Sequence, residues 1–314
     1  MIYPVPAYKT LLITGVSGFI GRVLARHFNS KGYLVYGIDR IPSENAPLSD
    51  LQAYEQLDLP SPHLTSLLSR WHPDVLIHSA GRASVPVAMV DPRIDFHDGP
   101  LLTFELLEML RQNLPSCAFI LLSSAAVYGN PTVLPVSEGS PIQPVSPYGY
   151  HKWQSEIIGS EFARVYGLNT SSVRIFSAYG PGLRRQVIWD ICKKSLLKER
   201  LVLQGTGNES RDFIHVADIA VALETLISHA PMTGEVYNLG SGREVTIREL
   251  SQIILSTLEL DIEPLFDGLV PPGTPLNWRS DMTSLGNLGF APLISLEQGI
   301  KSFVQWCQAE LLTL

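Results

Sequence analysis

Residues 14–21 have the sequence TGVSGFIG and lie between an apolar, strand-like run and a helical stretch at 19–30. The glycines are Gly15, Gly18 and Gly21, and without Cβ atoms they permit a tight strand-to-helix turn and close packing of helix on strand. The backbone N–H groups at such a helix N-terminus also favour a phosphate. The stretch therefore predicts a dinucleotide-binding strand–helix–strand unit at the start of the chain.

A second strand-like run, residues 33–38, ends at Asp39. A carboxylate at this place accepts hydrogen bonds from the hydroxyls of the adenosine ribose, which favours NAD over NADP. Arg40 keeps the NADP alternative open, because a guanidinium there can bind a 2′-phosphate. We expect NAD, since Asp39 would repel the same phosphate.

Tyr148 and Lys152 stand four residues apart in the run SPYGYHK, which has a helical pattern. Four residues is little more than one helical turn, so both side chains project from one face. The ammonium group is expected to lower the pKa of the phenol from about 10, and a cationic nicotinamide ring would lower that pKa further. The spacing predicts a general base suited to alcohol oxidation by hydride transfer.

Composition indicates a soluble protein of ordinary size. The chain has 314 residues, of which 45% are hydrophobic and 17% charged, enough for one large domain or two closely joined ones. A net charge of −7 argues against a nucleic-acid partner. No apolar run approaches the length of a membrane span, and the first residues lack the pattern of a signal peptide.

The three cysteines, Cys117, Cys192 and Cys307, are far apart in sequence. An odd number at wide spacing predicts neither a disulfide framework nor a zinc site, and we expect no metal. A reducing compartment follows, so the expected location is the cytoplasm.

Strand-like runs alternate with helical patterns through the first half of the chain. The expected strands are 11–14, 34–38, 75–78, 118–123 and 173–176, and the expected helices are 19–30, 62–71, 101–112 and 148–166. This order predicts an α/β fold with a doubly wound parallel (Rossmann) sheet.

After Phe176 the periodic pattern weakens, and Gly, Pro and Arg become frequent. We expect an NAD-binding Rossmann domain at 9–176 plus about 213–241. A smaller C-terminal substrate domain, for a nucleotide sugar, is expected at about 177–212 and 242–314.

Eight blocks, in this order along the chain, resemble the extended short-chain dehydrogenase/reductases, the family of NAD-dependent nucleotide-sugar epimerases and dehydratases. They are TGVSGFIG at 14–21, DL at 58–59, HSAG at 78–81, SSAAVYG at 123–129, Tyr148 with Lys152, RIFSAYGP at 174–181, RDFIHV at 211–216 and YNLGSG at 237–242.

The resemblance implies a catalytic role for Ser124, Tyr148 and Lys152. Tyr148 would be the general base, Lys152 its electrostatic partner and a ligand of the nicotinamide ribose, and Ser124 a hydrogen-bond partner of the reacting sugar oxygen. The implied NAD-binding residues, besides Tyr148 and Lys152, are Gly15, Gly18, Phe19, Ile20, Gly21, Asp39, Arg40, Asp58, Leu59, Ser79, Ala80 and Gly81. The implied substrate-binding residues are Ser84, Ser124, Ser177, Arg211 and Arg279, with Arg211 on the substrate diphosphate.

The chain departs from the family pattern at three places. Ala125 and Ala126 stand where dehydratases and decarboxylases of the family have an acidic residue after the catalytic Ser or Thr. Gly99 replaces an asparagine, and Ser177 replaces another. Alanine cannot move a proton, so the first departure favours oxidation and re-reduction at one carbon over dehydration. The changes at Gly99 and Ser177 bear on the identity of the substrate rather than on the hydride chemistry.

The resemblance therefore implies an NAD-dependent epimerase of a nucleoside-diphosphate sugar, similar to UDP-glucose 4-epimerases, that acts through a transient 4-keto sugar. A dehydratase or keto-reductase of the same family remains an alternative. A non-catalytic NAD(P)-binding sensor is a more remote one.

Simpler roles remain open for several residues. The glycines could serve the turn alone, Ser124 could only cap a strand end, and the Tyr148/Lys152 pair could lie on a helix surface. Core or interface roles are expected for His78, His151 and His215. Asp218 is expected to be a helix N-cap.

The helices expected at 101–112 and 148–166 carry apolar residues on more than one face. One sheet contact does not use all of them, so pairing of two subunits through these helices, a homodimer, is expected.

Overall fold

The computed structural model describes residues 9–270 and 272–312. Its centre is a parallel sheet of seven strands in the order β11-β6-β5-β4-β1-β2-β3. The strands are β1 (Thr10–Thr14), β2 (Leu34–Asp39), β3 (Ala53–Gln56), β4 (Val75–His78), β5 (Ala118–Ser124), β6 (Thr170–Ile175) and β11 (Thr233–Leu239). The predicted doubly wound α/β sheet is confirmed, and two strands without a clear apolar run, β3 and β11, extend it at its edges.

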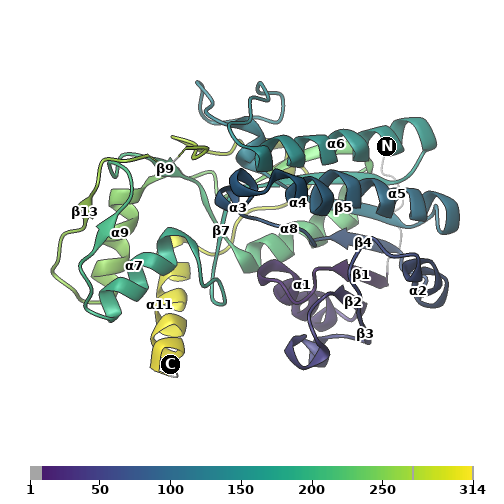
Figure 1. Cartoon of the computed structure of the whole chain (residues 1–314), viewed down its shortest axis with the longest axis horizontal. Helices are drawn as coiled ribbons and strands as arrows, with labels where there is room; N and C mark the ends of the chain where they lie inside the picture. The colour runs from purple at the N-terminus through teal and green to yellow at the C-terminus, as the bar shows by residue number, and fades with distance from the viewer. Residues whose placement is uncertain (1–8, 271, 313–314) are drawn as a thin grey trace.

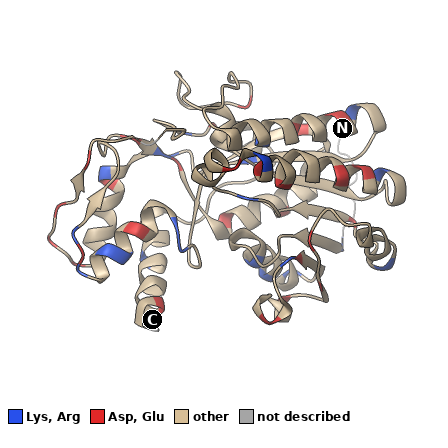
Figure 2. Cartoon of the chain, in the orientation of Figure 1, with Lys and Arg blue, Asp and Glu red and all other residues tan. Residues whose placement is uncertain are grey.

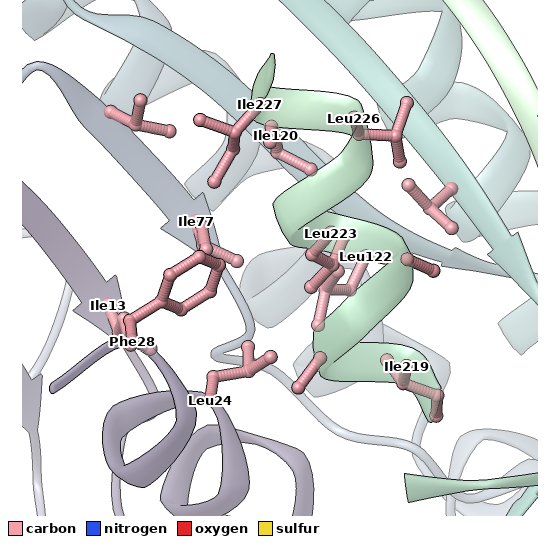
Figure 3. Packing of buried hydrophobic residues seen from close by; sticks show 14 of the residues in the cluster. Ile13, Leu24, Phe28, Ile77, Ile120, Leu122, Ile219, Leu223, Leu226 and Ile227 are labelled. Atoms are coloured by element: carbon pink, nitrogen blue, oxygen red, sulfur yellow. The ribbon is translucent and has the colours of Figure 1, made fainter. Parts of the chain in front are cut away.

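Helices cover both faces of the sheet because its central strands are apolar on both sides. Leu11 and Ile13 of β1 face α1 (Phe19–Ser30) and α8 (Val216–His229), where Figure 3 shows Leu24 and Phe28 beside Leu223 and Ile227. Leu12, between them, packs with the helices of the opposite face. These are α2 (His63–Trp71), α5 (Leu102–Asn113) and α6 (Pro147–Tyr166).

Two short helices and a π-helical turn lead from β4 into α5. They are α3 (Val85–Val90), α4 (Pro92–Phe96) and η3 (His97–Leu101). All three pack against α6 (Figure 1), so this segment lies beside the helix that carries Tyr148 and Lys152. Short 3-10 turns occur at η1 (Ser43–Asn45), η2 (Leu48–Asp50) and η4 (Ala125–Tyr128).

We call the sheet with its covering helices the sheet lobe. A second lobe, which we call the helical lobe, consists of α7 (Gln186–Leu196), α9 (Ile247–Thr257) and α11 (Leu296–Leu312) around their own apolar core (Figure 1). The remaining short elements are β7 (Ser177–Tyr179), β8 (Val202–Leu203), β9 (Ser210–Arg211), β10 (Phe213–His215), β12 (Val245–Thr246), β13 (Leu265–Phe266) and α10 (Thr283–Asn287). The chain enters the helical lobe at α7, returns to the sheet lobe with α8 and β11, and leaves it again with α9.

The carboxylate of Asp212 links the chain segments that pass between the two lobes. It is fully buried and accepts hydrogen bonds from the backbone N–H and hydroxyl of Ser241 (2.6 and 2.8 Å) and from the N–H of Gly242 (3.0 Å). Ser280 donates its N–H and its hydroxyl to the second oxygen. One carboxylate therefore joins three segments that are distant in sequence, and it fixes the backbone next to Arg211.

The N-terminus of α6 lies unusually close to the chain that follows β5. A Cβ added at Gly149 would stand 2.5 Å from the carbonyl oxygen of Ala126. Ser146 caps the helix by accepting the N–H of Gly149 at 3.2 Å. This contact holds the first turn of α6, and Tyr148 on it, against the end of β5.

Acidic and basic residues are mixed over both lobes (Figure 2). Within the described residues, no helix is both long enough and apolar enough to span a lipid bilayer.

We expect Gly149→Ala to destabilise the protein by about 1–3 kcal/mol, because the new methyl group overlaps the Ala126 carbonyl. The matched control is Gly159→Ala in the same helix, where the nearest atom, Ser172 Oγ, would be 3.8 Å from the new Cβ. That change should stabilise the protein by up to about 1 kcal/mol through helix propensity. Urea unfolding of the two variants measures both effects, and equal behaviour would contradict the packing argument.

Candidate active site

A cavity of about 1220 Å³ extends between the sheet lobe and the helical lobe. Both lobes contribute to its wall, and most of the residues that the sequence singled out lie on it. They are Gly18, Phe19, Ile20, Arg40, Ser79, Ala80, Gly81, Ser84, Ser124, Tyr148, Lys152, Ser177 and Arg211. The carboxyl ends of β1, β4 and β5 lead into this cavity, as expected for a doubly wound sheet.

Gly15 and Gly21 shape the first strand-to-helix turn instead of lining the cavity. Gly15 has φ of +69°, and a Cβ on it would lie 2.7 Å from Ala80. A Cβ on Gly21 would lie 2.3 Å from the carbonyl oxygen of Gly15. Side chains at these two positions would separate α1 from β1 and from the loop after β4.

The N-terminus of α1 is suited to the pyrophosphate of NAD. Gly18 is its N-cap and provides no side chain, and the first turn holds no acidic residue, so no carboxylate competes for its N–H groups. Gly18, Phe19 and Ile20 border the cavity at this point. The residues present therefore fit the dinucleotide that the glycine pattern predicts.

Asp39 lies at the end of β2 and accepts the N–H of Ser17 at 2.9 Å. The carboxylate thereby ties the glycine turn to the second strand, beside the place expected for the adenosine ribose. Arg40 follows it and is exposed at the cavity wall. Asp58 is exposed and Leu59 half-buried, both off the cavity wall, so their expected contact with adenine stays a prediction.

Ser124, Tyr148 and Lys152 come together on the cavity wall. The Ser124 hydroxyl caps η4 by accepting the N–H of Ala126 at 3.2 Å, and it is also hydrogen-bonded to Tyr148. Lys152 Nζ donates to the carbonyl oxygen of Leu122 at 2.8 Å and lies 5.9 Å from the centre of the Tyr148 ring. Ser124 therefore has both the capping role and a place at the site.

The pKa values of this group differ from the simplest expectation. Burial raises the pKa of Tyr148. The hydrogen bond with Ser124 opposes this shift, and so does the positive charge of Arg185, whereas the negative charge of Asp95 adds to it. The surroundings within the chain therefore do not produce the expected drop toward neutrality. Burial also lowers the pKa of Lys152 to about 8, against the opposing carboxylates of Asp95 and Glu156.

Arg211 forms the cationic end of the cavity in the helical lobe. Its Nη1 donates to the carbonyl oxygens of Ser210 (2.7 Å) and Leu276 (3.1 Å), and its guanidinium lies 5.6 Å from the centre of the Trp278 ring. Burial lowers its pKa to about 10, and nearby Glu209 opposes that shift. The guanidinium therefore remains charged at neutral pH and is held in place for an anionic ligand.

The other expected substrate-binding residues differ in position. Ser84 caps α3 by accepting the N–H of Val87 at 3.4 Å, and Ser177 begins β7; both line the cavity. Arg279 is exposed and lies off the cavity wall, with its Nε directed to the carbonyl oxygen of Gly242 at 2.9 Å.

Two cationic residues on the cavity wall were not among the predicted site residues. Arg185 lies on the wall and donates to the carbonyl oxygen of Ala83 at 2.8 Å. Lys194, also on the wall, donates to Asp190 (2.8 Å) and to the carbonyl oxygen of Val202 (2.9 Å). From the sequence, Arg184 and Arg185 could either reach a diphosphate or lie at a solvated helix start, whereas Lys194 had no motif to single it out.

The histidines take structural positions. His78 is buried beside Thr14 Oγ1, at 2.8 Å, and His151 Nδ1 lies 2.6 Å from a carboxylate oxygen of Asp95. His215 is the N-cap of α8, since its Nδ1 accepts the N–H of Ala217 at 3.2 Å. The expectation that Asp218 caps this helix was wrong.

Asp218 lies inside the first turn of α8 and is buried. It accepts the N–H groups of Leu293 and Ile294, each at 3.1 Å. Its carboxylate therefore holds the segment that precedes α11 against the start of α8.

Comparison with known proteins agrees with the geometry. Residues 11–240 match the model of the NAD dependent epimerase/dehydratase family. A putative UDP-glucose 4-epimerase of Methanocaldococcus jannaschii is 30% identical, over 94% of this chain and 97% of its own length.

Two solved structures are similar along nearly the whole chain. The UDP-glucose 4-epimerase of Thermotoga maritima with UDP-glucose has a TM-score of 0.88 and 27% identity, covering 96% of this chain and all of its own (100%). The complex of the Thermus thermophilus UDP-glucose 4-epimerase with NAD has a TM-score of 0.86 and 25% identity, covering 96% and 99%. The protein described here therefore belongs to the NAD-dependent epimerase/dehydratase family.

Proposed function

We propose that the protein is an NAD-dependent 4-epimerase of nucleoside-diphosphate sugars. The observation that carries this proposal is a single cavity that holds a helix N-terminus suited to a pyrophosphate, the Ser124/Tyr148/Lys152 group and the guanidinium of Arg211. A dinucleotide and a second diphosphate both find their complementary groups there. The similar epimerases support the sugar nucleotide as substrate.

Tyr148 acts as the base that removes the proton from the C4 hydroxyl, and Ser124 holds the reacting oxygen. When bound, NAD supplies the hydride acceptor and a positive ring charge that favours the phenolate. The ammonium group of Lys152, hydrogen-bonded to Leu122, is a fixed positive charge beside the phenol. The same Tyr148 returns the proton to the C4 oxygen. The keto sugar has by then turned its other face toward the nicotinamide, and the hydride would be returned to that face, so the configuration at C4 is inverted.

Arg211 holds the substrate diphosphate while the sugar turns. A guanidinium presents a planar set of donors, and two of its contacts are already fixed by the carbonyls of Ser210 and Leu276. A diphosphate anchored at this end leaves the sugar free to rotate near Tyr148. Anchoring also supplies rate, because hydride transfer needs reacting atoms about 3–3.5 Å apart.

The wall next to Ser124 disfavours dehydration. Ala125 is buried and Ala126 borders the cavity, and neither side chain can donate or accept a proton. Elimination of water needs a further acid or base beyond the tyrosine. Epimerisation needs none, so it is the reaction that these residues support best.

The first test is an assay of the purified protein with a panel of UDP-, GDP-, CDP- and dTDP-sugars. We expect interconversion of one pair of C4 epimers without net accumulation of reduced nicotinamide, because the cofactor is regenerated. Tyr148→Phe should lower kcat by about 100- to 10,000-fold, as expected for loss of a general base. Bound NAD and the melting temperature should be nearly unchanged in that variant.

Three outcomes would refute this assignment. Inactivity with every member of the panel would remove the epimerase, and net consumption of NAD(P)H would indicate the keto-reductase alternative. A parallel loss of NAD binding and turnover in Tyr148→Phe would remove the role of the phenol.

The diphosphate contact is tested by comparing two arginines. Arg211→Gln should raise KM for the sugar nucleotide by about 10- to 100-fold, the effect of losing charge-assisted hydrogen bonds, with a smaller change in kcat. Arg279→Gln should change KM by less than about threefold, since that side chain is exposed and lies off the cavity wall. Equal effects would show that the substrate extends to Arg279, as the family resemblance implied.

We also propose a homodimer formed through α5 and α6. Leu106, Leu107 and Leu110 of α5 are buried in the sheet lobe, but a second set of apolar side chains on these helices remains exposed. That set comprises Phe104, Ile157, Val165 and Tyr166, with Leu101 just before α5. A second copy of the chain would cover it.

Light scattering at micromolar concentration should give the mass of a dimer. Ile157→Lys should shift the mass to that of a monomer, because a charge would be buried in the contact. The control is Leu293→Lys, which changes an apolar residue next to the helical lobe that is more exposed than Ile157 (71% against 49%) and should leave the mass unchanged. A wild-type monomer would refute the proposal.

Two further assignments rest on weaker support. The three cysteines are free thiols, which supports a cytoplasmic location. The interleaved lobes support the division into an NAD-binding part, 9–176 plus about 213–241, and a substrate part formed by the remainder.

A further inference from the structure

A buried carboxylate that the mechanism above does not use lies beside the catalytic pair. Asp95 of α4 is 4% exposed and accepts a hydrogen bond from His151 Nδ1 at 2.6 Å. His151 is on α6, between Tyr148 and Lys152 in sequence, and its ring meets that of Phe96 edge-on, with 5.5 Å between the ring centres. The pair therefore belongs to the α4–α6 contact, next to the site and outside the cavity wall.

A carboxylate is costly to bury unless a partner of opposite charge or a set of hydrogen bonds compensates it. The charge of Asp95 acts on both catalytic groups. Burial raises the pKa of Tyr148, and Asp95 raises it further. Burial lowers the pKa of Lys152, and Asp95 opposes that shift. Both effects have the sign of a negative charge close to a phenol and an ammonium group.

We propose that Asp95, held in place by His151, is a positioning residue: a buried counter-charge to Lys152 that sets the pH range in which the Tyr148/Lys152 pair works. The proposal rests on the proposed function, since it assumes that Tyr148 is the base. It assigns a role to a residue that lies 53 positions before Tyr148 in the sequence.

Other charged groups near α6 do not replace Asp95 in this role. Glu156 also interacts with Lys152, but it is buried in an ion pair with Arg174 of β6, with 2.7 Å between Arg174 Nη2 and Glu156 Oε2. Its charge is therefore balanced locally. His78 of β4 is near Lys152 as well, and burial lowers its pKa to about 3, so it stays neutral.

The remaining groups lie on the other sides of the pair. Arg185, before α7, acts on Tyr148 with the opposite sign to Asp95. In η3, the turn after α4, His97 and Asp98 form a second His–Asp pair, with 3.0 Å between Nδ1 and Oδ1, but it is more exposed, at 51% and 19% of the side chains. Asp98 also lies 3.3 Å from Arg82 Nε, so this more exposed group contains a His–Asp pair whose charge is shared with an arginine, and it provides the control.

The sign of the expected effect follows from electrostatics. Asp95 disfavours the phenolate and favours the ammonium, so its negative charge raises both pKa values. Activity requires phenolate and ammonium together, so the pH profile is bell-shaped and its two limbs are set by the pKa values of Tyr148 and Lys152. Neutralising Asp95 must therefore move both limbs toward lower pH.

The test is Asp95→Asn in the full-length, NAD-loaded enzyme. Asparagine keeps the size of the side chain and an oxygen that can accept from His151, so only the charge is lost. We expect both limbs of the kcat profile to shift to lower pH relative to those of the wild-type enzyme. Asp95→Glu, which keeps the charge, should restore the position of both limbs even where kcat is reduced.

Asp98→Asn is the matched control and should leave both limbs in place. A reduced kcat with unmoved limbs in Asp95→Asn would mean a merely structural residue and would overturn the proposal. An equal shift in Asp98→Asn would overturn it too, because a general charge effect would then suffice.

A second measurement separates this proposal from the proposed function. The ionisation of Tyr148 can be followed without any sugar, as the ultraviolet difference between the NAD-loaded protein and its Tyr148→Phe variant. Asp95→Asn should lower the pH of that transition even if no sugar nucleotide is turned over. An unchanged transition would overturn the role of Asp95, whether or not the enzyme is an epimerase.

Discussion

The site depends on the close approach of α6 to the end of β5. Gly149 lies against the carbonyl of Ala126, and only a residue without Cβ permits this distance. The residue before Gly149 is the candidate base, and the residue two before Ala126 is its hydroxyl partner, so one contact sets the position of both. Packing of α4 and η3 on the same helix adds Asp95 to the group. The arrangement of the candidate catalytic residues thus results from the packing of the first turn of α6 against the end of β5.

The sheet lobe could largely be predicted from the sequence because its elements carry strong local signals. The buried strands are continuous apolar runs, and the glycine turn marks the first crossing to a helix. The helical lobe could not be predicted at this level. Its strands β8, β9, β12 and β13 have two residues each, too short for a period, and are held by contacts such as those of Asp212 that join distant segments.

The candidate site follows the same division. Residues in local motifs, such as Ser124, Tyr148 and Lys152, lie together as predicted, whereas Asp95 and Lys194 had no motif to reveal them. The protonation behaviour was the least predictable feature. A Lys four residues from a Tyr suggests a lowered phenol pKa, but burial acts in the opposite direction and outweighs it in the chain alone.

The chain crosses between its lobes more than once, with α8 and β11 inserted between α7 and α9. Neither lobe therefore corresponds to one uninterrupted stretch of the gene. A recombination event with a single breakpoint cannot exchange the helical lobe as one piece, as it could in a protein with sequential domains. Exchange of the helical lobe would require replacing several segments at once, each compatible with the Asp212 carboxylate that joins them.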